Sequence, residues 1–94
     1  MSAKSTLPNV AGPPRAQILE DVKRIVGEVL GTTPDDIQEK NVLDSDLGCD
    51  SLDFVEIMTS VEDQFGISIQ DEDAEKVRSV GDIVDGVQRL SSDP

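Results

Sequence analysis

The sequence predicts an all-α fold, a small bundle of three main helices plus one short helix, with a long loop between the first two main helices. Three segments repeat apolar residues at spacings of three and four, which is the pattern of helices that bury one face. The 94 residues suffice for one hydrophobic core but not for two. We therefore expect one domain at residues 15–90, a flexible extension at 1–14 and a frayed end at 91–94.

The first helix is expected over about residues 15–30. Gly31 suits the position just after a helix end, where a left-handed conformation is common. Residues 1–14 contain three prolines and no apolar periodicity, which is typical of a disordered extension. The apolar stripe of the helix consists of Ile18, Val22, Ile25, Val26, Val29 and Leu30.

Residues 32–50 form the long connection to the second helix. Thr33 and Pro34, followed by two acids, resemble a helix start with threonine as the cap, so a short helical turn is expected to end near Gln38. A loop of this length in a small domain usually has its own packing or function. The apolar residues that should fasten it to the bundle are Val42, Leu43 and Leu47.

The second helix is predicted to run from Ser51 to Phe65 and to end before Gly66. Asp50 is a favourable N-cap residue, and Asp53 occupies the position of the acidic member of a capping box. Since Asp50 supplies the cap, the Ser51 hydroxyl should point into solvent. Free backbone N–H groups and the positive end of the helix dipole lie beside it, a setting that favours an attached phosphate.

One face of this second helix is expected to join the core, while the other presents negative charge. Leu52 should stay partly exposed, either as an ordinary surface residue or as an apolar contact for partners. The core stripe is predicted to be Phe54, Val55, Met58, Val61 and Phe65, flanked by Ile57. The solvated acids are Asp53, Glu56, Glu62 and Asp63.

A short extended link and two further helices complete the predicted bundle. Residues 71–77 should form a brief helix. The final helix should follow a capping-box-like start at Ser79 and run to about Leu90. Gly81 and Gly86 should weaken it locally by up to about 1 kcal/mol each, because glycine loses more backbone freedom on folding than other residues.

The composition excludes most catalytic and metal chemistry. The chain has no His, Trp or Tyr and one cysteine, Cys49, so it can form neither an intramolecular disulfide nor a Cys-rich metal site. It also lacks the histidine of a Ser-His-Asp relay or of a His-ligated zinc. The chain contains no run of about 18 apolar residues, which a membrane-spanning helix would need, and its N-terminus has no apolar secretory segment. We expect a cytoplasmic, monomeric protein that is not an enzyme.

Negative charge is concentrated in the middle of the chain. The formal net charge is −12, and no Lys or Arg falls between residues 41 and 75. Nucleic-acid binding is therefore excluded, and the expected partners are proteins with basic patches. The alternative is that the acids only keep a small domain soluble. The eleven acids of the interval are Asp44, Asp46, Asp50, Asp53, Glu56, Glu62, Asp63, Asp71, Glu72, Asp73 and Glu75.

Several motifs in one order make the chain resemble the acyl carrier protein family. They are the segment 46–53, which contains Asp50-Ser51-Leu52, then the segment 62–67, and then the acidic segment 71–77. The tripeptide alone would more often be only a helix cap, but several motifs together are far more specific. In that family the serine of the tripeptide carries 4′-phosphopantetheine from coenzyme A, and the match puts this arm on Ser51.

The resemblance implies a carrier of acyl chains rather than a catalyst. A phosphopantetheinyl transferase would modify Ser51, and the arm would take thioesters to fatty-acid-synthesis enzymes and acyltransferases with basic docking patches. The residues read by these partners would be Asp50, Leu52, Asp53, Glu56, Glu62 and Asp63. An acyl pocket would be lined by Val55, Met58, Val61, Ile69, Ala74, Val77 and Ile83, each of which is also an ordinary core position.

Two positions depart from the family pattern, and other functions stay open. Cys49 replaces the usual alanine, and Phe54 stands where a small polar residue is frequent and could narrow the pocket. The carrier could instead serve a polyketide or specialised lipid pathway. Rivals from other classes are an acidic divalent-cation-binding protein and an unmodified adaptor. An EF-hand loop that starts at Asp44 fails, because Gly48 and Val55 fall at ligand positions.

Overall fold

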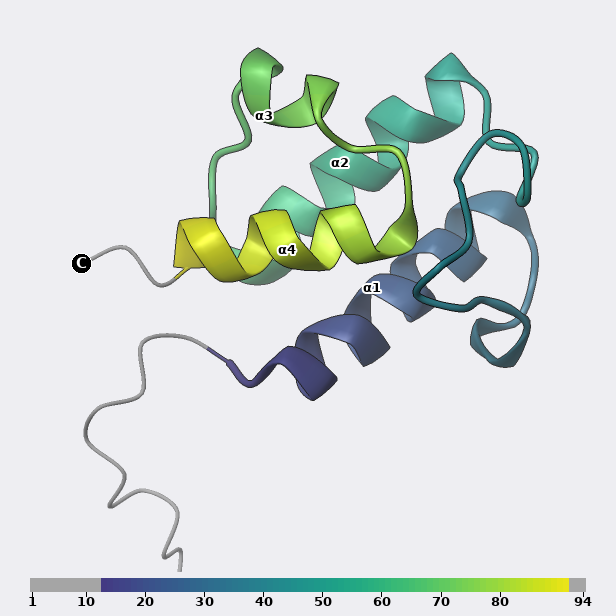
Figure 1. Ribbon diagram of the computed structural model, residues 1–94, viewed down its shortest axis with the longest axis horizontal. Coiled ribbons are helices and arrows are strands. Elements are labelled where there is room, and N and C mark those ends of the chain that lie inside the picture. Colours follow the sequence, from purple (N-terminus) through teal and green to yellow (C-terminus); the bar gives the residue numbers. More distant parts are fainter. Residues whose placement is uncertain (1–12, 92–94) are drawn as a thin grey trace, which may run out of the picture.

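The chain folds into a helical bundle in a computed structural model that describes residues 13–91 (Figure 1). The predicted all-α class is confirmed, and so are the three main helices, the short helix and the long loop. Most of the expected extension at 1–14, and residues 92–94, lie outside the described residues. The elements are α1 (Arg15–Leu30), a 3-10 turn at Pro34–Asp36, α2 (Ser51–Phe65), α3 (Asp71–Glu75) and α4 (Val80–Ser91).

Helix α1 is the element against which the bundle is built. It packs against both α2 and α4, which contact each other less. Figure 1 shows α4 in front of α2, with α3 above α4 and α1 below. The α1 side chains Ile18, Val22 and Val26 are fully buried, as the predicted stripe requires. Within residues 13–91, no helix has both the length and the apolar character needed to cross a membrane.

Most helix ends follow the predicted local rules. Gly31 and Gly66 adopt left-handed backbone angles, with φ of 76° and 64°, and each closes the last turn of its helix with its N–H. At the start of α4, the Asp82 N–H donates to Ser79 Oγ at 3.2 Å, and the Ser79 N–H donates to Asp82 Oδ2 at 3.1 Å. The capping box predicted there is confirmed.

The predicted threonine cap is wrong. The Thr33 hydroxyl donates to Asp36 Oδ2 at 3.1 Å and caps no backbone N–H. The turn ends at Asp36 rather than near Gln38. These three residues make a single 3-10 turn. The fixed φ of Pro34 and the backbone hydrogen bonds within the turn stabilise it.

The predicted apolar stripe of α2 is wrong at two positions. Ile57, which we expected only to flank the stripe, is fully buried, whereas Val55 is 58% exposed. The cause is helix geometry, because each residue turns by about 100°, so Val55 lies a quarter-turn away from Phe54. Met58 and Val61 share the buried face with Ile57.

Backbone hydrogen bonds hold the long loop against the start of α4. Val42 and Ser79 form an isolated antiparallel bridge, and the Leu43 N–H donates to the Arg78 carbonyl at 2.8 Å. These bonds join segments that are distant in sequence, so the loop is part of the folded unit. The apolar residues that fasten it are Leu43 and Ile37, both buried, with Leu47 partly buried beside them.

Gly81 lies where the loop approaches α4 most closely. Its N–H donates to the Glu39 carbonyl at 2.8 Å, and a Cβ at Gly81 would lie only 3.1 Å from Glu39 Cγ. The glycine thus has a packing reason besides its expected cost in helix stability. Glu39 and Asp85 also form ion pairs with Arg15, and the hydrogen bond to Glu39 is the main reason that the pKa of Arg15 is raised.

Candidate functional site

Ser51 occupies the first helical position of α2, next to a complete capping box. The Asp53 N–H donates to Asp50 Oδ1 at 2.8 Å, and the Asp50 N–H donates to Asp53 Oδ2 at 3.3 Å. The predicted cap is confirmed. Two carboxylates do the capping, so the Ser51 hydroxyl is not needed for it, and the residue is exposed. The site therefore offers an accessible hydroxyl at the positive end of a helix.

The loop before Ser51 is fixed by a turn at Gly48. Gly48 has φ of 72°, in the left-handed region that favours glycine. Directly after it, the Cys49 N–H donates to the Leu43 carbonyl at 2.9 Å, and the Cys49 side chain joins the core at 8% exposure. The segment before Ser51 is thus fixed to the core through Cys49, and it places the serine at the surface.

The Cys49 thiol stays protonated at neutral pH. Burial raises its pKa, and the carboxylates of Asp53, Asp50 and Asp44 raise it further because they disfavour a thiolate nearby. A protonated thiol is a poor nucleophile. Cys49 therefore packs as a small apolar residue.

A hollow of about 350 Å³ lies beside Ser51, and we call it the serine hollow. Its walls come from the long loop, from the first turns of α2 and from the segment after α3. Of the predicted acyl-pocket residues, Val55 and Val77 line it. The apolar lining is Leu43, Cys49, Phe54, Val55 and Val77, and the polar lining is Asp44, Asp50, Ser51 and Arg78.

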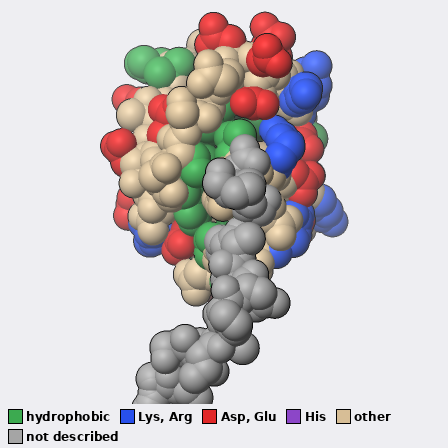
Figure 2. All heavy atoms as spheres, turned by 90° about the vertical axis from the view of Figure 1, so that its left-hand side faces the viewer, with side chains coloured by type: hydrophobic (Ala, Val, Ile, Leu, Met, Phe, Trp, Pro, Cys, Tyr) green, Lys and Arg blue, Asp and Glu red, His purple; other side chains and the backbone are tan. Residues whose placement is uncertain are grey.

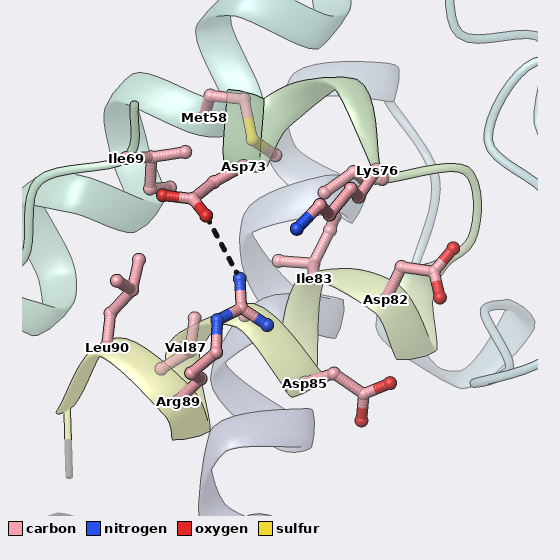
Figure 3. A pocket seen from close by; sticks show the side chains of 12 residues that line it. Met58, Ile69, Asp73, Lys76, Asp82, Ile83, Asp85, Val87, Arg89 and Leu90 are labelled. Atoms are coloured by element: carbon pink, nitrogen blue, oxygen red, sulfur yellow. Dashed lines mark hydrogen bonds and ion pairs between the residues drawn. The ribbon is translucent and has the colours of Figure 1, made fainter. Parts of the chain in front are cut away.

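A second hollow of about 140 Å³ lies between α2, α3 and α4, and we call it the α3–α4 hollow (Figure 3). Asp73 of α3 and Arg89 of α4 form an ion pair of 3.2 Å in this hollow, drawn as the dashed line in Figure 3. Val77 lines both hollows, so it stands between them. The predicted acyl-pocket residues that line the α3–α4 hollow are Met58, Ile69, Val77 and Ile83.

The structure does not bring all predicted pocket residues to a hollow. Val61 is fully buried in the core, Ala74 is half-buried, and neither lines one of the two hollows. Leu90 and Arg78 do line a hollow, although neither residue was among the predicted site residues. Leu90 ends an apolar stripe and is a detectable candidate, whereas nothing local to Arg78 indicates that it lies near Ser51.

The predicted recognition residues lie mostly on the exposed side of α2. Leu52 is 67% exposed and Glu56 is exposed, in agreement with the sequence. Glu62 differs, because its carboxylate accepts a hydrogen bond of 2.7 Å from the Ile69 N–H and so holds the link after α2. Asp63, the next residue, is exposed.

Charge is unevenly distributed over the surface. Figure 2, which looks onto the left-hand end of the view in Figure 1, shows acidic side chains at the top of this face. Most Lys and Arg side chains gather on one side of it, hydrophobic side chains form a strip down its middle, and further acidic side chains lie at both edges. A charged partner would therefore meet different faces with different affinity.

Comparisons with known proteins place the chain in a family. The family model of the phosphopantetheine attachment site matches residues 20–87. The acyl carrier protein of Wolinella succinogenes is 45% identical over 67 residues, which are 71% of this chain and 88% of that protein. The acyl carrier protein of Exiguobacterium sp. is 46% identical over 70 residues, which are 74% of this chain and 89% of that protein.

A solved structure agrees with these sequences. The acyl carrier protein from Enterococcus faecalis superposes with a TM-score of 0.69 at 32% identity, covering 83% of this chain and 99% of that one. The helical bundle and the phosphopantetheine attachment domain define a carrier, a protein that holds a group for enzymes rather than a catalyst. The chain belongs to the acyl carrier protein family, as the resemblance of its motifs implied.

The cofactor of this carrier is 4′-phosphopantetheine. The start of α2 fits such a group. Ser51 presents a hydroxyl that the capping box leaves unused, the helix N-terminus and Arg78 provide positive charge for a phosphate, and the serine hollow provides apolar walls.

Proposed function

We propose that the protein is a discrete acyl carrier of fatty acid synthesis whose arm is attached to Ser51. The observation that carries this proposal is the exposed Ser51 hydroxyl, left unused by the capping pair Asp50 and Asp53. The bound arm supplies a thiol that holds the acyl chain as a thioester. Ser51 itself is a substrate of a phosphopantetheinyl transferase and no catalyst, because the chain has no histidine to activate its hydroxyl as a base.

The two hollows are the proposed shelter for the acyl chain. In this proposal a chain that enters the serine hollow passes Phe54 and Val55, and Val77, which lines both hollows, leads it toward Met58 and Ile83 in the α3–α4 hollow. Burial stabilises the chain by about 0.8 kcal/mol for each CH₂ group that leaves water. Val61 and Ala74 line neither hollow and are left out of the proposed shelter.

The exposed side of α2 is the proposed docking face for partner enzymes with basic patches. Asp50, Asp53 and Glu56 supply negative charge there, and Leu52 and Val55 supply exposed apolar surface at its centre. Such a face attracts a cationic partner at long range and adds a small apolar contact at short range. Glu62 and Asp63 extend the acidic face along the helix. We place this work in the cytoplasm.

Intact-mass measurement tests the attachment site. Incubation with coenzyme A and a phosphopantetheinyl transferase should add one arm to the protein and none to Ser51→Ala. Ser45→Ala is the matched control, because Ser45 is an exposed serine of the loop that precedes α2 and should leave loading unchanged. Loading of Ser51→Ala, or no loading of the natural sequence, would contradict the proposal.

The acyl chain found on native material tests the pathway. Protein purified from its own cells should carry saturated or β-hydroxy fatty acyl groups of several lengths, released by hydroxylamine because they are thioesters. Polyketide intermediates in the same mass spectrum would move the protein to the alternative pathway. Material without any arm would favour an unmodified adaptor.

A further inference from the structure

Arg78 lines the serine hollow without a neutralising partner. Arg15, Arg24 and Arg89 each form an ion pair with a carboxylate. Among residues 13–91, the Arg78 side chain has neither an ion pair nor a hydrogen bond. In a chain of net charge −12, an arginine without a carboxylate partner is unexpected, and the three other arginines of residues 13–91 all have one. Its guanidinium is therefore available to an anion that the polypeptide itself does not supply.

The backbone holds Arg78 in place beside the site. Its carbonyl accepts the Leu43 N–H at 2.8 Å, and the Leu43 carbonyl accepts the Cys49 N–H at 2.9 Å. Its own N–H donates to Asp82 Oδ2 at 2.9 Å, within the cap of α4. Two hydrogen-bonded steps thus connect the backbone of Arg78 to the loop that carries Ser51, so the base of the arginine side chain is held on the wall of the serine hollow.

The charges around the hollow identify the kind of group that fits. Asp44 and Asp50 also line it, and both would repel a phosphate attached to Ser51. Arg78 is the one cationic residue in the lining of the serine hollow, whereas Lys76, two positions earlier, lines the α3–α4 hollow. A phosphodiester on Ser51 therefore has a cation on the same wall to offset the two acids.

We infer that Arg78 binds the phosphodiester that joins the arm to Ser51, and so keeps the arm against the apolar wall of the serine hollow in the free carrier. The inference rests on the proposed attachment at Ser51. A phosphodiester shares one negative charge between two oxygens, which matches the two-pronged guanidinium group. The methyl groups of the arm then lie against Phe54, Val55 and Val77, and docking to a basic partner competes for the same phosphate.

Nuclear magnetic resonance of the loaded protein tests this inference. Arg78→Ala and the control Lys76→Ala each remove one positive charge, but only the first removes it from the serine hollow. Both are loaded with excess transferase, and intact mass verifies loading before each spectrum. In the natural sequence and in Lys76→Ala, cross-peaks should connect the arm methyl groups with Val55 and Val77. In Arg78→Ala they should disappear at low salt, and the ³¹P shift should move toward that of a free phosphodiester. Arg78→Lys should restore only part of the effect.

The outcomes separate the two proposals. If the natural sequence gains no mass, the attachment at Ser51 is wrong and the role of Arg78 falls with it. If both variants load and give the same cross-peaks and ³¹P shift as the natural sequence, attachment stands and Arg78 does not bind the phosphodiester. If Arg78→Ala fails to load while Lys76→Ala loads, the guanidinium serves the transferase, and the inference is overturned.

Discussion

At the residue scale, Asp50 determines whether Ser51 is available. A serine at a helix start can itself accept a backbone hydrogen bond, and its hydroxyl then turns toward the helix. In this protein the Asp50 carboxylate accepts the Asp53 N–H at 2.8 Å, so the serine one position later is left without a capping role. The Asp50 carboxylate thus stabilises the start of α2 and at the same time leaves the Ser51 hydroxyl exposed.

Removal of this cap should destabilise the protein measurably. Asp50→Ala should lower the free energy of unfolding by about 1 kcal/mol, because the Asp53 N–H loses its acceptor. Asp50→Asn should lose much less, since an amide oxygen can still cap. Urea denaturation followed by circular dichroism gives both values. Asp63→Ala, which removes an exposed acid from the same helix, is the control, and an equal effect there would show that charge rather than capping is responsible.

At the element scale, helix geometry separates the buried residues of α2 from its exposed residues. Ile57 is fully buried, while Leu52 and Val55 are 67% and 58% exposed. All three are large aliphatic residues, so their side chains alone do not tell them apart. Their positions around the helix do, because Leu52 and Val55 lie close to Ser51 on the solvent-exposed side of α2.

Truncation of Ile57 and truncation of Val55 should therefore change the free energy of unfolding by very different amounts. Ile57→Ala should cost about 2–5 kcal/mol of unfolding free energy, as a cavity forms in the core. Val55→Ala should change it by less than about 0.5 kcal/mol, as is usual for surface substitutions. Chemical denaturation measures both. A large loss for Val55→Ala would mean that Val55 faces the core, as the apolar periodicity first indicated.

At the scale of the whole molecule, charge opposes the compact state. The net charge of −12 is carried by one small bundle, and the eleven acids of residues 41–75 have no cation between them in sequence. Repulsion of this kind is screened by salt over distances of about 10 Å at 0.1 M. The same excess of negative charge attracts basic partners, so the property that weakens the fold favours fast docking.

Added salt should consequently raise the melting temperature. Between about 0.01 M and about 0.5 M NaCl, the Debye length shortens from about 30 Å to well below 10 Å, and we expect the melting temperature measured by calorimetry to rise by several degrees. The double variant Asp71→Asn and Glu72→Gln removes two exposed charges and should show a smaller increase, whereas the neutral control Thr59→Ser should behave like the natural sequence. A melting temperature that ignores ionic strength would show that repulsion does not limit stability.

Local rules predicted the helices well because helix signals are short-range. The bounds of α1 and α2, the cap at Asp50 and the glycine ends at Gly31 and Gly66 depend on residues within one turn of each other. The predicted Thr33 cap was wrong because another short-range interaction forms instead. The Thr33 hydroxyl donates to Asp36 Oδ2. Apolar periodicity located α2 but assigned Val55 to the wrong side.

Residue order alone therefore specified the helices, the acidic surface, the absence of catalytic histidine and the candidate Ser51. It could not specify which distant segments meet. The hydrogen bonds from Leu43 to Arg78 and from Cys49 to Leu43 bring an arginine and the serine to the lining of one hollow, and Val77 comes to line both hollows. Such contacts form only when the loop packs onto α4, and burial of Ile37 and Leu43 stabilises that packing. No local sequence pattern specifies which distant segments meet.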